Sequence, residues 1–204
     1  TIFSGHVDRE NDFHLTDVST KFFYFTSLGG QWEKAYKMAL DFAKTHNAKI
    51  TFNPGSPQFH GGKETVHEVL QNTNILFLNK EEAERILKLT PHEAIPTLLK
   101  GLRELGPAII VITDGTKGAY AYDGNEMLIV PMYPDQKPPF ERTGAGDAFA
   151  SGFVAEYVRS GDISKAIQIA TANASSVVTQ YGGKAGILKA GDNGPWPLVE
   201  VSKK

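Results

Sequence analysis

The sequence predicts an α/β fold of three layers, in which helices cover both faces of a mostly parallel central sheet. Short apolar stretches alternate along the chain with longer amphipathic stretches of helical spacing. This alternation is typical of parallel strands that are buried on both faces. Late in the chain, two short strand-like stretches surround Asp123-Gly124-Asn125, which is a hairpin signal. We therefore expect one antiparallel hairpin toward the C-terminal part of the sheet.

The individual elements follow from the same patterns of period two and period 3.6. The expected strands cover residues 22–26, 49–53, 74–78, 108–113, 118–122 and 127–131, and residues 1–3 also look strand-like. The expected helices cover residues 31–46, 62–71, 80–88, 92–105, a stretch from Ala148 to about Ser160, and a stretch from Asp162 to about Tyr181. Gly29-Gly30 is expected to break the chain after the first strand, and the Gly-, Pro- and Lys-rich tail after Gly182 is expected to be irregular.

Composition narrows the class of protein. The chain has 204 residues, 41% of them hydrophobic, and a formal net charge of −2, so no nucleic-acid or membrane partner is expected. There is no cysteine, which excludes disulfides, thiol catalysis and cysteine-bound zinc. Without an apolar run of membrane length or a visible signal peptide, we expect one cytoplasmic domain over residues 1–204. The first residue is Thr1 rather than Met, which suggests a truncated or processed chain.

The most informative stretch is Thr143-Gly144-Ala145-Gly146-Asp147, which leads directly into an amphipathic helix. The first turn of a helix has backbone N–H groups without intrahelical acceptors and the positive end of the helix dipole. Glycines let an anion approach these groups closely. The sequence therefore predicts an anion cradle with a carboxylate, Asp147, at its edge, as phosphoryl transfer to a hydroxyl requires.

The same residues also have an ordinary structural interpretation. The glycines can end a loop, and Asp147 can stabilise the helix N-terminus. Two other glycine motifs are excluded. A dinucleotide-binding motif requires Gly or Ala where Phe149 stands. A P-loop requires Gly-Lys-Ser/Thr, but Gly62-Lys63 is followed by Glu64.

The stretch from Thr143 to Phe149 resembles the signature of ribokinase-like (PfkB) carbohydrate and nucleoside kinases, commonly Asp-Thr-Thr-Gly-Ala-Gly-Asp. Glu141 and Arg142 replace the first two residues of that pattern. The resemblance implies that Asp147 accepts the proton of the substrate hydroxyl, and that the backbone from Gly144 through Ala145 to Gly146 stabilises the transferring phosphoryl group, with Thr143 beside them.

Other motifs follow in the order that this family has. Asn79-Lys80-Glu81-Glu82 resembles its Asn-x-x-Glu element, which implies that Asn79 lies near the nucleotide phosphates and that Glu82 helps to order Mg²⁺ through water. The alternative is a helix cap formed by the same two residues, and both roles can coexist.

The segment from Thr113 to Gly118 resembles the family's nucleotide loop, with Thr113, Gly115 and Gly118 at the matching positions. An ordinary glycine turn is the alternative, and Lys117 either meets phosphate or is solvated. Asn53-Pro54 resembles a segment at the edge of the nucleotide site, although we favour a turn that ends a strand.

The resemblance also implies a polar residue against the adenine and, in some members, a potassium ion. Thr171 and Asn173 are both candidates for the adenine contact, and they face different sides of one helix. The Gly182-Gly183 turn matches the potassium loop, but Glu141 stands where that site usually has Asp, which puts K⁺ in doubt.

The resemblance covers roughly residues 2–188 and corresponds to the C-terminal two-thirds of a ribokinase-like fold. The N-terminal strands and the β lid of the family are therefore expected to be absent, together with most sugar contacts and the surface through which these kinases form homodimers. The implied function is an ATP- and Mg²⁺-dependent sugar kinase. A nucleoside (adenosine-type) kinase and a non-catalytic nucleotide-binding fragment or homologue remain as alternatives. This part of the fold alone is expected to be nearly inactive.

Overall fold

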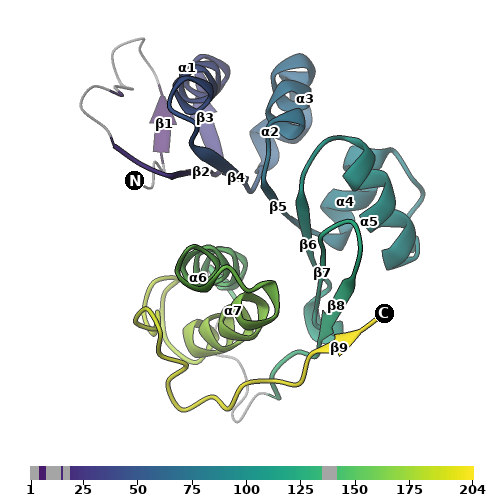
Figure 1. Ribbon diagram of the computed structural model, residues 1–204, viewed down its shortest axis with the longest axis vertical. Coiled ribbons are helices and arrows are strands. Elements are labelled where there is room, and N and C mark those ends of the chain that lie inside the picture. Colours follow the sequence, from purple (N-terminus) through teal and green to yellow (C-terminus); the bar gives the residue numbers. More distant parts are fainter. Residues whose placement is uncertain (1–4, 8–14, 16–18, 135–141) are drawn as a thin grey trace. The chain divides into compact units, whose positions relative to one another are not determined.

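The structure is a computed structural model that describes residues 5–7, 15, 19–134 and 142–204. The chain divides into two compact units, residues 1–111 and residues 112–204, and each is described here by itself (Figure 1). The boundary falls inside one strand, β6 (Ile109–Thr113). No helix among the described residues combines the length and the apolarity needed to cross a membrane.

The first unit contains parallel strands in the order β2 (Phe22–Phe25), β4 (Lys49–Phe52) and β5 (Ile75–Asn79). Phe22 pairs with Lys49 and Thr51 pairs with Ile75. The start of β6 joins them, because the Ile109 amide donates to the Asn74 carbonyl at 2.8 Å. Most residues of these strands are buried, which explains why the strands read as largely apolar runs. The expectation of an α/β fold that starts with parallel strands is confirmed.

Helices connect the strands of this unit: α1 (Trp32–Thr45), α2 (Ser56–His60), α3 (Lys63–Gln71), α4 (Lys80–Leu87) and α5 (Ile95–Glu104). Helix α1 packs on β2 and α3, and α4 packs on α5. Helix α5 begins three residues later than the expected start at His92, because Pro96 lies in its first turn, the position that a helix tolerates best. The short helix α2 was not predicted.

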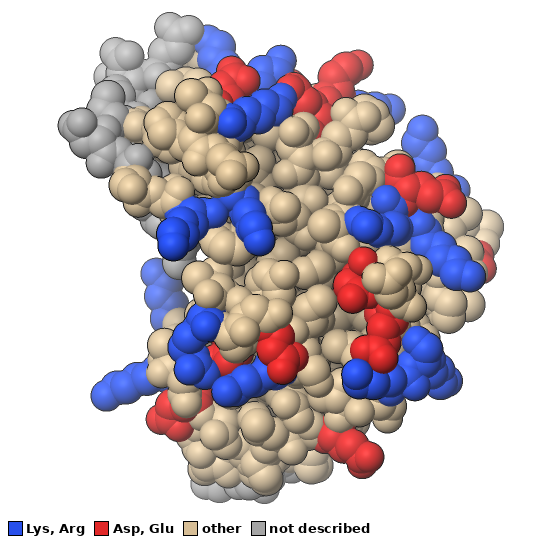
Figure 2. Space-filling view, in the orientation of Figure 1, with Lys and Arg blue, Asp and Glu red and all other residues tan. Residues whose placement is uncertain are grey.

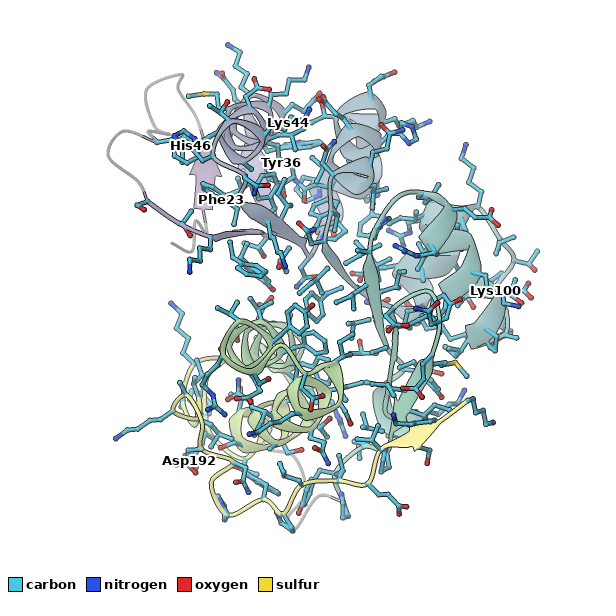
Figure 3. All side chains as sticks on the ribbon, in the orientation of Figure 1. Phe23, Tyr36, Lys44, His46, Lys100 and Asp192 are labelled. Atoms are coloured by element: carbon cyan, nitrogen blue, oxygen red, sulfur yellow. The ribbon has the colours of Figure 1, made fainter. Side chains whose placement is uncertain are left out.

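Aromatic side chains fill the space between α1 and the neighbouring strands. The Tyr36 ring lies 5.0 Å from the Phe25 ring and 5.8 Å from the Phe52 ring, measured between centroids. Figure 3 labels Phe23 and Tyr36 in this cluster, where the Phe23 ring also makes an edge contact with Phe42 at 5.5 Å. Burial raises the pKa of Tyr36, and its hydroxyl donates to the Thr26 carbonyl. The first unit therefore has a core of its own.

Gly29-Gly30 does not simply interrupt the chain, as the sequence predicted. It belongs to a short strand, β3 (Leu28–Gly30), which pairs in parallel with β1 (Gly5–Val7) in a separate two-stranded sheet. The first strand does end before these glycines, because β2 stops at Phe25 and the chain then enters the second sheet at Leu28. The strand-like residues 1–3 lie outside the described residues.

The second unit contains the predicted hairpin. Strand β7 (Ala119–Tyr122) pairs antiparallel with β8 (Met127–Val130). The Asp123 carboxylate accepts hydrogen bonds from the amides of Asn125 and Glu126, at 2.8 and 2.9 Å, and thereby fixes the turn. Strand β9 (Ser202–Lys203) pairs with the edge of β8. The sequence predicted an irregular tail, and this prediction is wrong for the last residues, which form a strand. Two polar residues carry no strand signal of their own, and the β8 edge supplies the missing partner.

Two long helices complete this unit, α6 (Ala145–Ser160) and α7 (Ile163–Val178). They pack closely against each other, and α7 also contacts β7 and β8. Gly152 makes the close approach possible, because a Cβ there would lie 3.1 Å from the Asn173 side chain. The predicted N-cap is confirmed, since the Asp162 carboxylate accepts from the Lys165 amide at 3.1 Å.

The tail contributes Trp196, Leu188 and Val199 to a small hydrophobic cluster. Trp196 is buried with Tyr133 and Ala172, and the Trp196 and Tyr133 rings meet edge to face at 4.9 Å.

Basic and acidic side chains are interspersed over the face of the described residues that Figure 2 shows. Such a mixed surface is ordinary for a globular protein.

Candidate functional site

The predicted glycine turn forms the start of α6. Gly144 is the N-cap residue with a φ of 80°, and no side chain caps the helix. The Ala145 amide donates to the Arg142 carbonyl at 3.2 Å, and the Ala148 amide donates to the Gly144 carbonyl at 2.8 Å. The amides of Gly146 and Asp147 lie between these two, in the turn where a helix has no intrahelical acceptors. The helix begins at Ala145, three residues before the expected Ala148, so Asp147 is inside its first turn.

The two glycines of this turn are needed for different reasons. A Cβ on Gly144 would lie 2.6 Å from the Gly183 carbonyl oxygen, and the positive φ of Gly144 would strain any other residue. A Cβ on Gly146 would meet no atom of the described residues within 4 Å. The fold therefore requires glycine at position 144, whereas at position 146 glycine only keeps space open in front of the helix amides.

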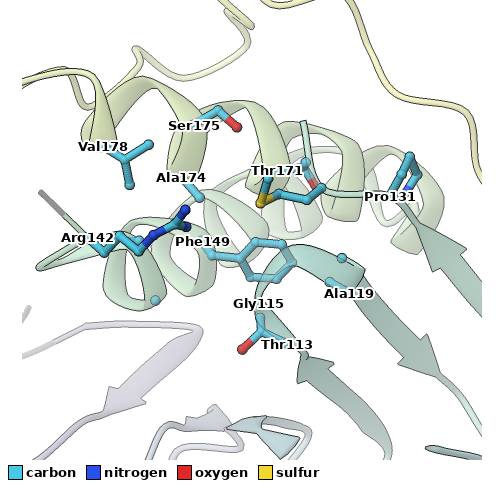
Figure 4. A pocket seen from close by; sticks show the side chains of 14 residues that line it. Thr113, Gly115, Ala119, Pro131, Arg142, Phe149, Thr171, Ala174, Ser175 and Val178 are labelled. Carbon is cyan, nitrogen blue, oxygen red and sulfur yellow. The ribbon is translucent and has the colours of Figure 1, made fainter. Parts of the chain in front are cut away.

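That space belongs to a cavity of about 240 Å³ within the second unit. Its walls come from the end of β6 and the loop after it, the residues that follow β8, the glycine turn, and one face of α7 (Figure 4). The lining residues are Thr113, Gly115, Gly118, Ala119, Pro131, Met132, Arg142, Ala145, Gly146, Phe149, Thr171, Ala174, Ser175 and Val178. Most of the side chains are apolar, as in typical small-molecule pockets.

The cavity brings together residues that were predicted from motifs far apart in the sequence. The predicted site residues that line it are Thr113, Gly115, Gly118, Ala145, Gly146 and Thr171. Thr143, Gly144, Asp147 and Asn173 are not among its lining residues. Asp147 is exposed at the start of α6, one residue beyond the lining position Gly146.

The loop after β6 is a single turn of 3₁₀ helix, Gly115–Lys117. The Asp114 amide donates to the Gly118 carbonyl at 2.9 Å, which closes the loop. A Cβ on Gly118 would lie 2.0 Å from the Val130 carbonyl oxygen, so the fold itself requires this glycine. A Cβ on Gly115 would meet no atom within 4 Å in the described parts of the chain. Lys117 lies 3.6 Å from the Asp114 carboxylate and is largely exposed.

The two candidates for the adenine contact occupy different surroundings. Thr171 lines the cavity, and its hydroxyl donates to the Ile167 carbonyl at 2.8 Å. Asn173 is 3% exposed, and its amide donates to the Ala148 carbonyl at 2.7 Å and accepts from the Leu188 amide at 2.8 Å. Both polar atoms of the Asn173 side chain are therefore engaged inside the unit, which favours Thr171 as the residue that meets a ligand.

Asn79 and Glu82 belong to the first unit, where they form the predicted capping arrangement. The Glu82 amide donates to the Asn79 side chain, and the Asn79 amide donates to the Glu82 carboxylate, both at 2.8 Å. Burial raises the pKa of Glu82, and the hydrogen bond to Asn79 opposes that shift. Among the described residues, no group of three or more acidic, histidine or cysteine side chains could hold a metal ion. A magnesium ion here would depend on one carboxylate, water and substrate oxygens, a common arrangement for Mg²⁺.

The remaining motif residues are Asn53, Glu141 and the Gly182-Gly183 turn. The Asn53 side chain donates to the Tyr24 hydroxyl at 3.1 Å, and its backbone amide donates to the Phe25 carbonyl. Glu141 lies outside the described residues. The Gly182-Gly183 turn is described, and Gly183 is the residue against which Gly144 packs.

Several lining residues were not predicted as site residues. Ala174, Ser175 and Val178 are three of them, and together with the predicted Thr171 they follow the spacing i, i+3, i+4, i+7, so the four residues form one stripe on α7. This spacing is visible in the sequence, but Ala174 and Val178 read there as part of a packing face. Arg142 was noted only as a departure from the family pattern, although its side chain faces the cavity (Figure 4).

Comparisons with known proteins show which family the chain resembles. A model of the pfkB family of carbohydrate kinases matches residues 11–190. Among curated proteins, a nucleoside kinase of Methanocaldococcus jannaschii is 34% identical over 136 residues, which cover 67% of this chain and 43% of that protein. A cytidine kinase of Thermococcus kodakarensis is 30% identical and a ribokinase of Bacillus subtilis 27% identical, covering 70% and 76% of this chain and 51% and 48% of theirs. The chain thus spans about half the length of these relatives.

Solved structures show the same fold. The crystal structure of the Methanocaldococcus jannaschii nucleoside kinase, an archaeal member of the ribokinase family, aligns with a TM-score of 0.67 and 28% identity. The alignment covers 85% of this chain and 54% of that chain. An E. coli protein assigned as a ribokinase II, solved in complex with ATP and Mg²⁺, aligns with a TM-score of 0.69 and 26% identity, covering 82% of this chain and 55% of that one.

Proposed function

The chain belongs to the pfkB family of carbohydrate kinases, and we propose that its protein transfers the terminal phosphoryl group of ATP to a hydroxyl group of a sugar. The observation that carries this proposal is the cavity beside the start of α6, where Gly146 keeps space open before helix amides that lack intrahelical acceptors. Since the chain spans about half the length of its curated relatives, the proposal concerns the whole protein.

In this proposal, the nucleotide lies along the cavity. The apolar wall formed by Phe149, Ala174 and Val178 suits a flat purine ring, and the hydroxyls of Thr171 and Ser175 supply polar contacts. Gly115 keeps the loop after β6 open to the ribose and phosphates. The phosphates then point toward Gly146, where the amides and the helix dipole stabilise negative charge.

Asp147 acts as the base in this scheme. It follows Gly146 directly and is exposed, so a substrate hydroxyl can reach it from solvent. The hydroxyl oxygen attacks the terminal phosphorus as the bond to the leaving phosphate oxygen breaks, and the hydroxyl proton passes to the Asp147 carboxylate. The transition state of such a transfer is loose, so positioning by the amides from Gly144 to Gly146 contributes more than the basicity of Asp147.

A magnesium ion would supply charge neutralisation on the phosphates. We propose that Glu82 holds its water ligands and that Asn79 lies near the phosphates, in addition to capping α4. A potassium ion near Gly182-Gly183 is a lesser proposal, because Glu141 stands where that site usually has Asp.

The acceptor has two candidate classes. A free sugar follows from the family's description. A nucleoside is favoured by a different observation, since two relatives at 34% and 30% identity are a nucleoside kinase and a cytidine kinase. Both acceptor classes carry a hydroxyl on a sugar ring, so the chemistry at Asp147 is the same.

Two further proposals concern the whole protein. It is a nucleotide-binding homologue without turnover if no acceptor is phosphorylated. A homodimer formed through the lid of the family is the expected assembly.

Calorimetry with ATP and ADP, followed by phosphorylation assays on a panel of sugars and nucleosides, tests the proposal. We expect nucleotide binding by this chain, and turnover of one acceptor class by the whole protein. Binding without turnover of any acceptor would support the non-catalytic alternative. A folded sample that binds neither ATP nor ADP at millimolar concentration would contradict the nucleotide site itself.

A further inference from the structure

Arg142 is the one charged side chain among the described residues that line the cavity. Within the part of the chain that the structure describes, no acidic side chain lines it. Figure 4 shows the Arg142 side chain reaching from the glycine turn toward Phe149 and Ala174. Arg142 therefore brings a positive charge to the side of the cavity where the first turn of α6 also presents its amides.

The position of Arg142 is fixed by the turn itself. Its carbonyl accepts the Ala145 amide at 3.2 Å, which holds its backbone against the start of α6. Its side chain and the open face of Gly146 thus border the same space. A guanidinium presents a planar fork of donors, which matches two oxygens of a phosphate group.

The rest of the cavity lining has a different character. The stripe on α7 offers two hydroxyls, of Thr171 and Ser175, and otherwise small apolar groups, and the residues after β8 add Pro131 and Met132. A ligand with an apolar ring at one end and negative charge at the other fits this distribution. This inference rests on the proposed nucleotide site and adds one residue to it.

We propose that the Arg142 guanidinium binds the phosphate chain of the nucleotide, beside the amides of Gly146 and Asp147. Arg142 is then a positioning residue for the phosphates and does not contact the base. The chain would distinguish nucleotides from nucleosides at this site largely through that charge.

Calorimetry on this chain with ADP and ATP tests the role of Arg142, with adenosine binding followed by ligand-observed NMR. Arg142→Gln should weaken ADP and ATP binding roughly 10- to 100-fold, the usual effect of losing a charged hydrogen bond, and leave adenosine binding unchanged. Arg142→Lys, which keeps the charge but not the planar fork of donors, should weaken ADP and ATP binding less than Arg142→Gln does. Added NaCl should weaken ADP binding more in the parent chain than in Arg142→Gln, because salt screens the charge pair.

Lys189→Gln is the matched control, since Lys189 is exposed, lies in the same unit and does not line the cavity. It makes the same charge change and should leave all affinities within about twofold. Unchanged ADP affinity in Arg142→Gln, while the parent chain binds ADP, would overturn the role of Arg142 alone. An equal fall in adenosine affinity would overturn it too, because Arg142 would then act on the base or the fold. Failure of the parent chain to bind any nucleotide would overturn the proposed function as well.

Discussion

The N-termini of α4 and α6 differ in how their backbone amides are satisfied. At α4, the Glu82 amide donates to the Asn79 side chain, and the Asn79 amide donates to the Glu82 carboxylate. At α6, the N-cap is Gly144, no side chain caps the helix, and the first turn borders a cavity. One helix start is capped by its own side chains, whereas the other has no side-chain cap and borders the cavity.

This difference separates two kinds of sequence motif. Asn-x-x-Glu is explained by the fold without a ligand, so any role with magnesium comes in addition to the cap. Gly146 has no such explanation, because no described residue fills the space that its missing Cβ leaves. Substitutions at the two helix starts should therefore separate stability from ligand binding.

The largest effect is expected for Asp147→Asn in the whole protein. Asparagine has the same shape but cannot accept the substrate proton, so turnover should fall by about 10²–10⁴. Loss of the charge at the helix N-terminus should cost only about 0.3–1 kcal/mol of stability. Steady-state kinetics, with ATP affinity and thermal unfolding as controls, measures this. Turnover equal to that of the parent protein would remove Asp147 from the mechanism.

The next effect distinguishes the two glycines of the turn. Gly144→Ala should destabilise the chain by about 2–4 kcal/mol, since it combines a strained φ with a clash against Gly183. Gly146→Ala should instead raise the melting temperature slightly, because alanine favours a helix by up to about 1 kcal/mol over glycine. The same change should weaken ATP binding by about tenfold or more, since the methyl group enters the phosphate space.

Thermal unfolding and calorimetry on both variants check this pair. A Gly146→Ala variant that is more stable and binds ATP normally would show that the open space is not a phosphate site. At the start of α4, by contrast, removal of the Asn79 side chain should lower stability.

The smallest effects concern α4. Asn79→Ala should cost about 1 kcal/mol of stability through loss of the cap. Glu82→Gln keeps a side chain that can complete the capping box, so stability should change by only a few tenths of a kcal/mol. If Glu82 also orders magnesium, the gain in ATP affinity on adding Mg²⁺ should shrink by about tenfold in Glu82→Gln. An unchanged gain would leave Glu82 with the capping role alone.

Much of the fold was predictable because its strands are apolar runs and its helices are amphipathic. The strands β2, β4, β5 and β6, the hairpin and the long helices all appear within a few residues of their expected bounds. The elements that were missed are short, and other segments stabilise them: β3 depends on β1, and β9 depends on the edge of β8. Their local sequence carries too little signal, since the pairing that forms them joins distant residues.

The site was predictable only where a motif marks it. The glycines of the turn and of the loop after β6 could be found in this way, and Thr171 was one of two candidates. The wall formed by Ala174 and Val178 could not, because the same small apolar residues also suit helix packing. Arg142 was visible as an unusual residue, but its place in the cavity wall depends on how the turn is folded.

The buried amide of Asn173 has a consequence for the energetics of ligand binding. It ties α7 to the Ala148 carbonyl, one residue beyond Asp147, and to the tail at Leu188. Two walls of the cavity, on α6 and α7, are thereby held in place before any ligand arrives. A ligand that enters this cavity then loses little of its binding free energy to ordering the protein, so its affinity reflects the contacts themselves.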